Sequence, residues 1–191
     1  MAEDAHNMRR ISRDEVYKLL IERGTTAIIR TLPIIGRAFS TSVNFYRKEL
    51  DSDEFKGLFL LPWDDWSLFQ YFSHSGLLNP SNRLCSIRLT DAVSQYPNSD
   101  KNDEHTKKIE TLKESILQNG YVDDFKSYAI FETAKPDDLY LVDGYHRVLA
   151  YQNLIGAGKV NYAKISFILG EVKSIEDTLG HFNRIRGNER R

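Results

Sequence analysis

The spacing of apolar residues predicts helices in five parts of the chain. A Ser12-x-x-Glu15 capping box precedes apolar positions at helical spacing, which indicates a short helix ending near Gly24. Three further stretches carry one apolar face each, at residues 37–50, 108–120 and 145–156, and glycines follow or end the last two. The tail from residue 174 is also predicted to be helical, with a basic end.

Alternation of apolar and polar residues predicts strands in the second half. These lie at residues 84–89, 127–132, 139–142 and 161–169, and the turn between the second and third is expected at Pro136-Asp137-Asp138. Residues 25–32 fit a strand or a buried helix equally, because the apolar run is too short for its period to decide. The order of elements predicts an α+β domain with helices packed on a small mixed sheet.

A turn-rich piece at residues 73–82 divides the chain. We therefore expect a mostly helical amino-terminal extension over residues 1–80, the α+β domain over residues 81–173, and a basic helical tail over residues 174–191. Aromatic residues recur between residues 55 and 72. They either pack the extension onto the domain or, if exposed, form a docking surface with Trp63 and Trp66 as anchors.

The chain concentrates candidate chemistry at one junction, where an apolar strand runs into Asp143-Gly144-Tyr145-His146-Arg147 and then a helix. Glycine lets the backbone turn tightly, and the first amides of a helix form a ready anion site. Arg147 either pairs with a phosphate or makes a structural salt bridge. Asp143 either holds Mg²⁺ or caps the helix, and His146 either transfers protons or bonds a local carbonyl.

The Asp-Gly-x-His-Arg turn, with Ala150 three positions after the arginine, resembles the signature turn of the ParB/sulfiredoxin superfamily. The resemblance extends from about residue 83 to about residue 169 and implies that family's fold. It also implies that Gly144, Tyr145, His146 and Arg147 cradle nucleotide phosphates. In sulfiredoxins the turn carries the catalytic cysteine, whereas this chain has Tyr145, so sulfiredoxin activity is excluded.

Other charged residues could complete the site. Asp123 and Asp124 follow the predicted helix end at Gly120, and paired carboxylates there could bind Mg²⁺ or simply form a solvated turn. Arg184 and Arg186 lie in the basic tail, where they suit DNA phosphates or only improve solubility. For the acidic pair Asp137-Asp138 we favour a solvated turn.

Composition narrows the function classes. The formal net charge of −1 argues against a domain that coats nucleic acid through bulk positive charge, so any DNA contact must be local. The single cysteine, Cys85, excludes an intramolecular disulfide and a cysteine-rich zinc site. No apolar run is long enough for a membrane span and the start lacks signal-peptide features, so we expect a cytoplasmic protein without membrane insertion.

The Asp143–Arg147 turn, taken together with the resemblance, leads us to expect a Mg²⁺-dependent phosphohydrolase; the resemblance implies that it binds ATP or CTP and acts as a nucleoside triphosphatase, a DNA nuclease or both. The resemblance implies several possible functions, because the superfamily includes DNA-clamping partition proteins, serine kinases, nucleases and small plasmid proteins that block conjugative DNA transfer. Too little chain follows the signature half for a full partition protein. The alternatives are a non-catalytic module that binds DNA or a protein of a transfer or secretion machine, and a small-molecule kinase.

Overall fold

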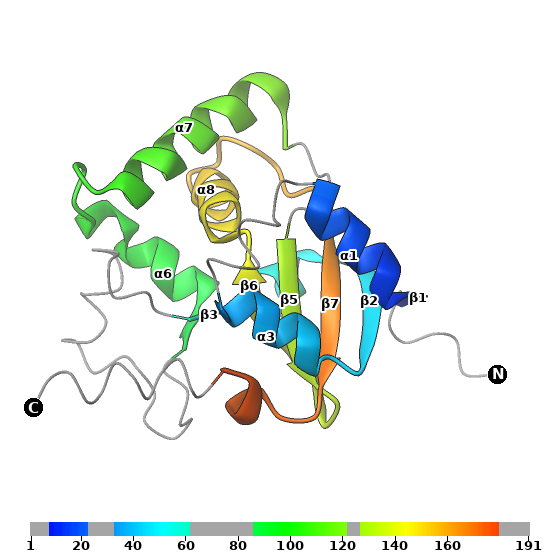
Figure 1. Ribbon diagram of the computed structural model, residues 1–191. Helices are drawn as coiled ribbons and strands as arrows, with labels where there is room; N and C mark the ends of the chain where they lie inside the picture. Colours follow the sequence, from blue (N-terminus) through cyan, green and yellow to red (C-terminus); the bar gives the residue numbers. More distant parts are fainter. Residues whose placement is uncertain (1–7, 23–32, 62–85, 122–126, 180–191) are drawn as a thin grey trace, which may run out of the picture.

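The chain is described by a computed structural model that covers residues 8–22, 33–61, 86–121 and 127–179. Within these ranges it is an α+β fold built on one mixed sheet of seven strands (Figure 1). The strand order across the sheet is β1-β2-β7-β5-β6-β3-β4. The strands are β1 (Met8–Ile11), β2 (Asn44–Leu50), β3 (Phe59–Leu60), β4 (Ile87–Arg88), β5 (Ser127–Glu132), β6 (Lys135–Asp143) and β7 (Ile165–Val172).

The centre of the sheet comes from the second half of the chain, and its edges come mainly from the first half. β7 pairs in parallel with β5, and β6 pairs in parallel with β3, while the other neighbours are antiparallel. Five of the six residues of β5 are buried, as expected for a strand covered on both faces. The residues expected to form a helical extension thus contribute β1, β2 and β3 to the same sheet.

Two amino-terminal helices, α1 (Arg13–Glu22) and α3 (Pro33–Thr41), lie on the near face of the sheet in Figure 1. The Ser12 hydroxyl accepts the Glu15 amide at 3.1 Å, so the predicted capping interaction begins α1. The short helix α4 (Ser52–Lys56) follows β2 and is capped by Asp51 and Glu54 in a reciprocal box. Lys48, a buried lysine of β2, forms an ion pair with Glu54.

Three other helices gather at one end of the molecule (Figure 1): α6 (Leu89–Gln95), α7 (Glu104–Asn119) and α8 (Tyr145–Gly156). The 3₁₀ turn η1 (Tyr96–Asn98) follows α6, and residues 175–179 are helical after β7. Aromatic contacts join α8 to its surroundings, since the Tyr151 ring lies 4.5 Å from that of Tyr121 and 5.8 Å from that of Phe55, centroid to centroid.

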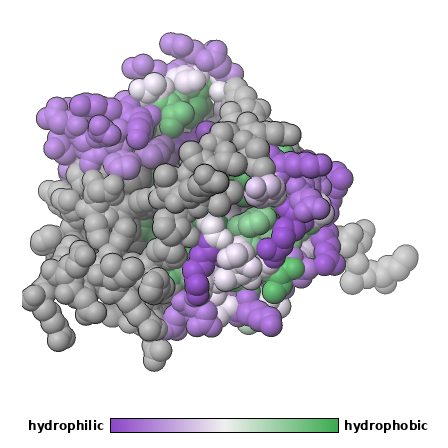
Figure 2. Space-filling view, viewed as in Figure 1, coloured by the Kyte–Doolittle hydropathy of each residue, from purple (hydrophilic) through white to green (hydrophobic). Residues whose placement is uncertain are grey.

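The outward side of α7 is largely hydrophilic (Figure 2). None of the helices in the described ranges combines the length and apolar character that a membrane crossing requires.

Most of the predicted elements of the second half are confirmed. The helix expected over residues 108–120 is α7, which ends before Gly120, and the strand expected over residues 127–132 is β5. The turn predicted at Pro136-Asp137-Asp138 is wrong, because these residues belong to β6 and the turn lies at Thr133-Ala134. Proline is tolerated there because position 136 lies near the start of its strand.

The helix predicted over residues 37–50 is wrong in its second half. Helix α3 ends at Thr41, and Asn44–Leu50 forms β2 with Phe45, Lys48 and Leu50 buried. The first two of these buried residues are three positions apart, as in a helix, and the last two are two positions apart, as in a strand. The local pattern therefore does not decide between helix and strand, and pairing with β7 decided the outcome. Residues 25–32, Gly24, Cys85, Trp63 and Trp66 lie outside the described residues.

Candidate functional site

The predicted strand, turn and helix around Gly144 are present. β6 ends at Asp143, Gly144 adopts a left-handed conformation with φ 98° and ψ 11°, and α8 begins at Tyr145. The Asp143 carboxylate accepts the Gly144 amide at 2.8 Å, and the Gly144 carbonyl accepts the amides of Arg147 and Val148. This bond stabilises the turn itself; it is not the helix-capping bond that was one of the two roles expected for Asp143, because it reaches the N-cap residue Gly144 and not an amide inside α8.

Position 144 requires glycine for two reasons, the backbone conformation of the residue and the lack of space for a side chain. Its φ lies in the region that L side chains rarely adopt, and an added Cβ would lie 2.5 Å from the Ser127 hydroxyl oxygen. Ser127 is buried at the start of β5, so the first turn of α8 lies directly against the central sheet. The position of the helix start is therefore set by the sheet and not by a loop.

Arg147 lies in the first turn of α8 and is partly buried. Within the ranges that the structure describes, no hydrogen bond or ion pair is found for its guanidinium group. The structural salt bridge considered as an alternative is therefore not seen among these residues. A forked cation without a protein partner beside a helix start is suited to an oxyanion such as phosphate.

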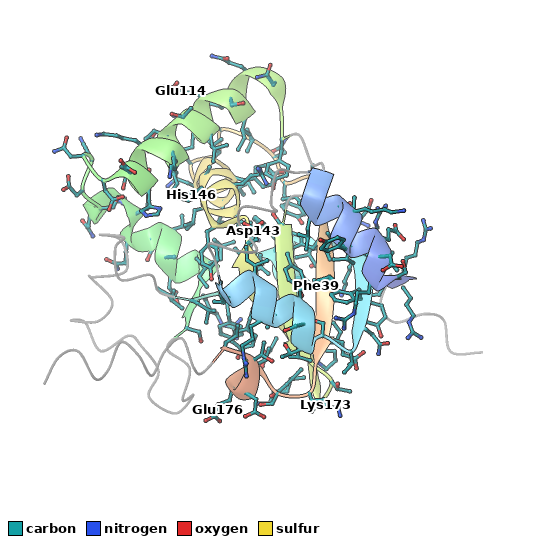
Figure 3. The ribbon with its side chains drawn as sticks, in the orientation of Figure 1. Phe39, Glu114, Asp143, His146, Lys173 and Glu176 are labelled. Atoms are coloured by element: carbon teal, nitrogen blue, oxygen red, sulfur yellow. The ribbon has the colours of Figure 1, made fainter. Side chains whose placement is uncertain are left out.

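His146 precedes Arg147 and contacts α7 (Figure 3). Its Nε2 lies 2.8 Å from Nδ1 of His105. One of the alternatives expected for His146 was a hydrogen bond to a local carbonyl, but Nε2 bonds a second histidine instead. The pKa of His146 is lowered from 6.5 to about 4, chiefly by burial; the nearby His105, Lys108 and Arg147 also lower it, and Asp103 opposes them. His146 is therefore neutral at pH 7 and able to accept a proton.

Tyr145, at the position of the sulfiredoxin cysteine, is buried and only 5% exposed. Its hydroxyl donates to the Leu141 carbonyl at 2.8 Å and accepts the Leu61 amide at 3.0 Å. The side chain thus connects the segment after β3 to β6 and belongs to the core. Any contact of Tyr145 with a phosphate at the helix start would come from its backbone amide.

The His105 side chain was not anticipated from the sequence. Asp103 caps α7 by accepting the amides of His105 and Thr106, so His105 lies in the first turn of that helix. The sequence signal that could have singled it out is Asp-x-His ahead of an amphipathic helix, which alone does not indicate a partner on α8. Only the packing of α7 on α8 brings the two histidines together.

Four other residues predicted for the site belong to segments that the structure does not describe. Asp123, Asp124, Arg184 and Arg186 lie outside the described residues. The acidic side chain of Glu132, at the end of β5, accepts the Ile175 amide at 3.0 Å and so stabilises the helical turn after β7. Among the described residues, no group of three or more His, Cys, Asp or Glu side chains could hold a metal ion.

Comparisons with known protein families, curated proteins and solved structures found no match to this chain. The chemistry of the site itself therefore indicates what the chain can do. The elements of the site are a left-handed glycine at a strand end, a helix start, a guanidinium with no partner among the described residues, a neutral imidazole and a carboxylate at Asp143. This combination can hold an anion, position it against a cation and accept a proton beside it.

Proposed function

We propose that this chain binds a nucleoside triphosphate together with Mg²⁺ at the start of α8 and hydrolyses a phosphate ester or anhydride bond there. The observation that carries the proposal is the partly buried Arg147 guanidinium, which has no protein partner among the described residues. The left-handed Gly144 supports it, because that turn leads the chain from β6 directly into the start of α8, and the amino-terminal end of a helix favours a bound anion.

The electrostatics of the site support an anionic ligand. Lys108 and Arg147 both act on His146 to disfavour its protonated form, which places two cations near that ring. The same positive potential that lowers the pKa of a histidine stabilises a phosphate. The first turns of α7 and α8 meet at the histidine pair, so the amino-terminal ends of two helices add to this potential.

The donor types also fit Mg²⁺ delivered with a nucleotide. Mg²⁺ is commonly bound through one or two carboxylates and the phosphates of the substrate, so a cage of three protein ligands is not required. Asp143 is the candidate carboxylate, at the end of β6 and partly buried (Figure 3). When bound, the ion would neutralise phosphate charge; the protein residues would position the substrate around it.

The roles of the residues follow from the chemistry of hydrolysis. Water attacks phosphorus, a new P–O bond forms, and the bond to the leaving phosphate oxygen breaks with its electron pair. Arg147 and the first amides of α8 stabilise charge on the phosphate oxygens, and His146 accepts the proton that the attacking water loses. The leaving oxygen needs only charge neutralisation when it belongs to a nucleoside diphosphate.

The test is phosphate release from ATP and from CTP with Mg²⁺, with and without single-stranded DNA, followed by inspection of the DNA for breakage. Arg147→Ala is expected to lower kcat/KM by roughly 10²- to 10³-fold, as for loss of one preorganised charge-stabilising donor. Its thermal midpoint should stay close to the wild type, because no protein partner of this guanidinium is found among the described residues.

Lys107→Ala is the matched control, because Lys107 is an exposed cation on the neighbouring helix α7. We expect it to retain wild-type phosphate release. The proposal is wrong if the wild-type protein neither binds nor hydrolyses either nucleotide, or if Arg147→Ala retains full activity. DNA breakage that is lost in Arg147→Ala would identify a nuclease that uses the same site.

A further inference from the structure

The two histidines of the site form a directed pair. Their ring planes differ by 4° and their centroids lie 5.1 Å apart, while Nδ1 of His105 and Nε2 of His146 are separated by 2.8 Å. The distance between the two nitrogens, added to the radii of the two rings, equals about the distance between the ring centroids. The line that joins the centroids therefore passes through both nitrogens. The imidazoles therefore lie edge to edge in nearly one plane, with the hydrogen bond along the line between them and no face-to-face stacking.

Both rings are attached to rigid elements. His105 is held in the first turn of α7 by the Asp103 cap, which accepts its amide at 2.7 Å. His146 lies in the first turn of α8, whose start is set by the Gly144 turn against β5. A hydrogen bond between two such elements can fix a ring orientation to the precision that chemistry at phosphorus requires.

The bond also determines where the His146 proton resides. A neutral imidazole has one donor and one acceptor nitrogen, so a donor at His105 Nδ1 would occupy the Nε2 lone pair of His146 and leave the His146 proton on Nδ1, where no further proton can be accepted. The proposed proton transfer therefore requires the other arrangement, in which His146 Nε2–H donates to His105 Nδ1 and the Nδ1 of His146 is the acceptor. Without the partner, the two tautomers of a neutral histidine exchange, and only a fraction of the molecules has the proton arrangement that the reaction uses.

We propose that His105 is a positioning residue of this site, and that its Nδ1 hydrogen bond holds the His146 imidazole in one orientation and one tautomer during phosphate hydrolysis. This inference rests on the proposed function. His105 acts on the reaction through His146, so it affects the chemical step more than the binding of the nucleotide. Asp103, Lys108 and Arg147 are the charged groups that act on the His146 ring from its surroundings.

Two substitutions separate the hydrogen bond from the packing. His105→Phe keeps an aromatic ring between α7 and α8 but removes the nitrogen. His105→Asn removes the ring but places an amide atom where Nδ1 lies, and this amide can donate or accept. We expect His105→Phe to lower kcat for phosphate release roughly 10- to 100-fold, the usual cost of losing a partner that orients a functional histidine, with KM little changed. His105→Asn should restore most of kcat.

The tautomer is measured directly by ¹⁵N NMR of the histidine side chains in the wild-type protein near pH 7. We expect one protonated and one unprotonated ring nitrogen for His146, with shifts that move toward tautomer averaging in His105→Phe and return in His105→Asn. Averaged His146 nitrogen shifts in the wild type would overturn the inference without any variant. This readout needs no nucleotide and does not depend on the folding of a variant.

The outcomes distinguish this inference from the proposed function. A wild-type protein that hydrolyses ATP or CTP, with His105→Phe equal to it in kcat, overturns the positioning role of His105 and leaves the function standing. A drop in kcat that His105→Asn does not restore points to lost packing and also overturns it. Absence of hydrolysis in the wild type, with a fixed His146 tautomer, overturns the proposed function and with it the role in hydrolysis.

Discussion

Gly144 is the residue on which the geometry of the site most directly depends. The left-handed turn, the contact with Ser127 and the start of α8 all meet at this one position. Its neighbours have different roles, since Tyr145 belongs to the core whereas Arg147 has no protein partner among the described residues. Adjacent residues of one motif thus differ in role, since Tyr145 stabilises the core whereas Arg147 is the residue that we propose binds a ligand.

Gly144→Ala is expected to destabilise the fold by about 2–4 kcal/mol, because the new Cβ combines left-handed strain with overlap on buried Ser127. The measurement is the free energy of unfolding from urea titration. The control is Gly156→Ala at the end of α8, where no atom lies within 4 Å of the added Cβ. That change should be neutral or stabilise by up to about 1 kcal/mol, and equal effects of the two would contradict the account of the turn.

At the scale of elements, Arg13 shows a use of a basic residue that the sequence did not indicate. Its guanidinium donates to the carbonyl of Ser42 at 2.6 Å and to that of Phe39 at 3.3 Å, at the end of α3. It also lies 5.2 Å from the Phe39 ring centroid and 5.4 Å from that of Phe45. Arg13 therefore connects α1 to the end of α3 and to β2.

Arg13→Ala is expected to lower the free energy of unfolding by about 1–2 kcal/mol, because two carbonyl contacts and a cation–π contact are lost together. Chemical denaturation measures the change. Arg9→Ala provides the comparison, since Arg9 is an exposed arginine on the neighbouring strand β1, and it should stay within about 0.5 kcal/mol of the wild type. Similar losses for both arginines would indicate a general charge effect instead.

For the whole molecule, burial of a neutral His146 links stability to pH. In the unfolded chain this imidazole titrates near 6.5, and in the folded protein burial brings its pKa to about 4. Between these values the unfolded chain binds more protons, so the free energy of unfolding decreases as the pH falls. The contribution of His146 is complete above about pH 6.5 and is lost by about pH 4.

Wild-type protein should therefore lose about 2–3 kcal/mol more stability between pH 7 and pH 4 than His146→Gln does. Carboxylates such as Glu110 and Glu171, whose pKa values are lowered, lose their contributions in a lower pH range and do so in both proteins. The measurement is the midpoint of thermal unfolding across this range. Parallel pH profiles for the two proteins would show that His146 is not buried in its neutral form.

The amino-acid sequence by itself determined most of the local structure of the second half, although not the turn between β5 and β6. The sequence predicts helix α7, strand β5 and the turn from β6 into α8. The signals are the spacing of apolar residues, the capping residues of the helices and a glycine, and each of them acts within a few residues. The candidate site at Gly144, His146 and Arg147 was found for the same reason. Its chemistry is contiguous in the chain.

Tertiary structure alone decided the rest. Asn44–Leu50 became β2 because β7 offered a pairing edge, and no local signal in its short apolar pattern could reveal that edge. His105 and His146 are 41 positions apart in the chain, and they meet only because α7 packs on α8. The neutrality of His146 has the same origin, since the burial that lowers its pKa depends on the packing of the whole molecule.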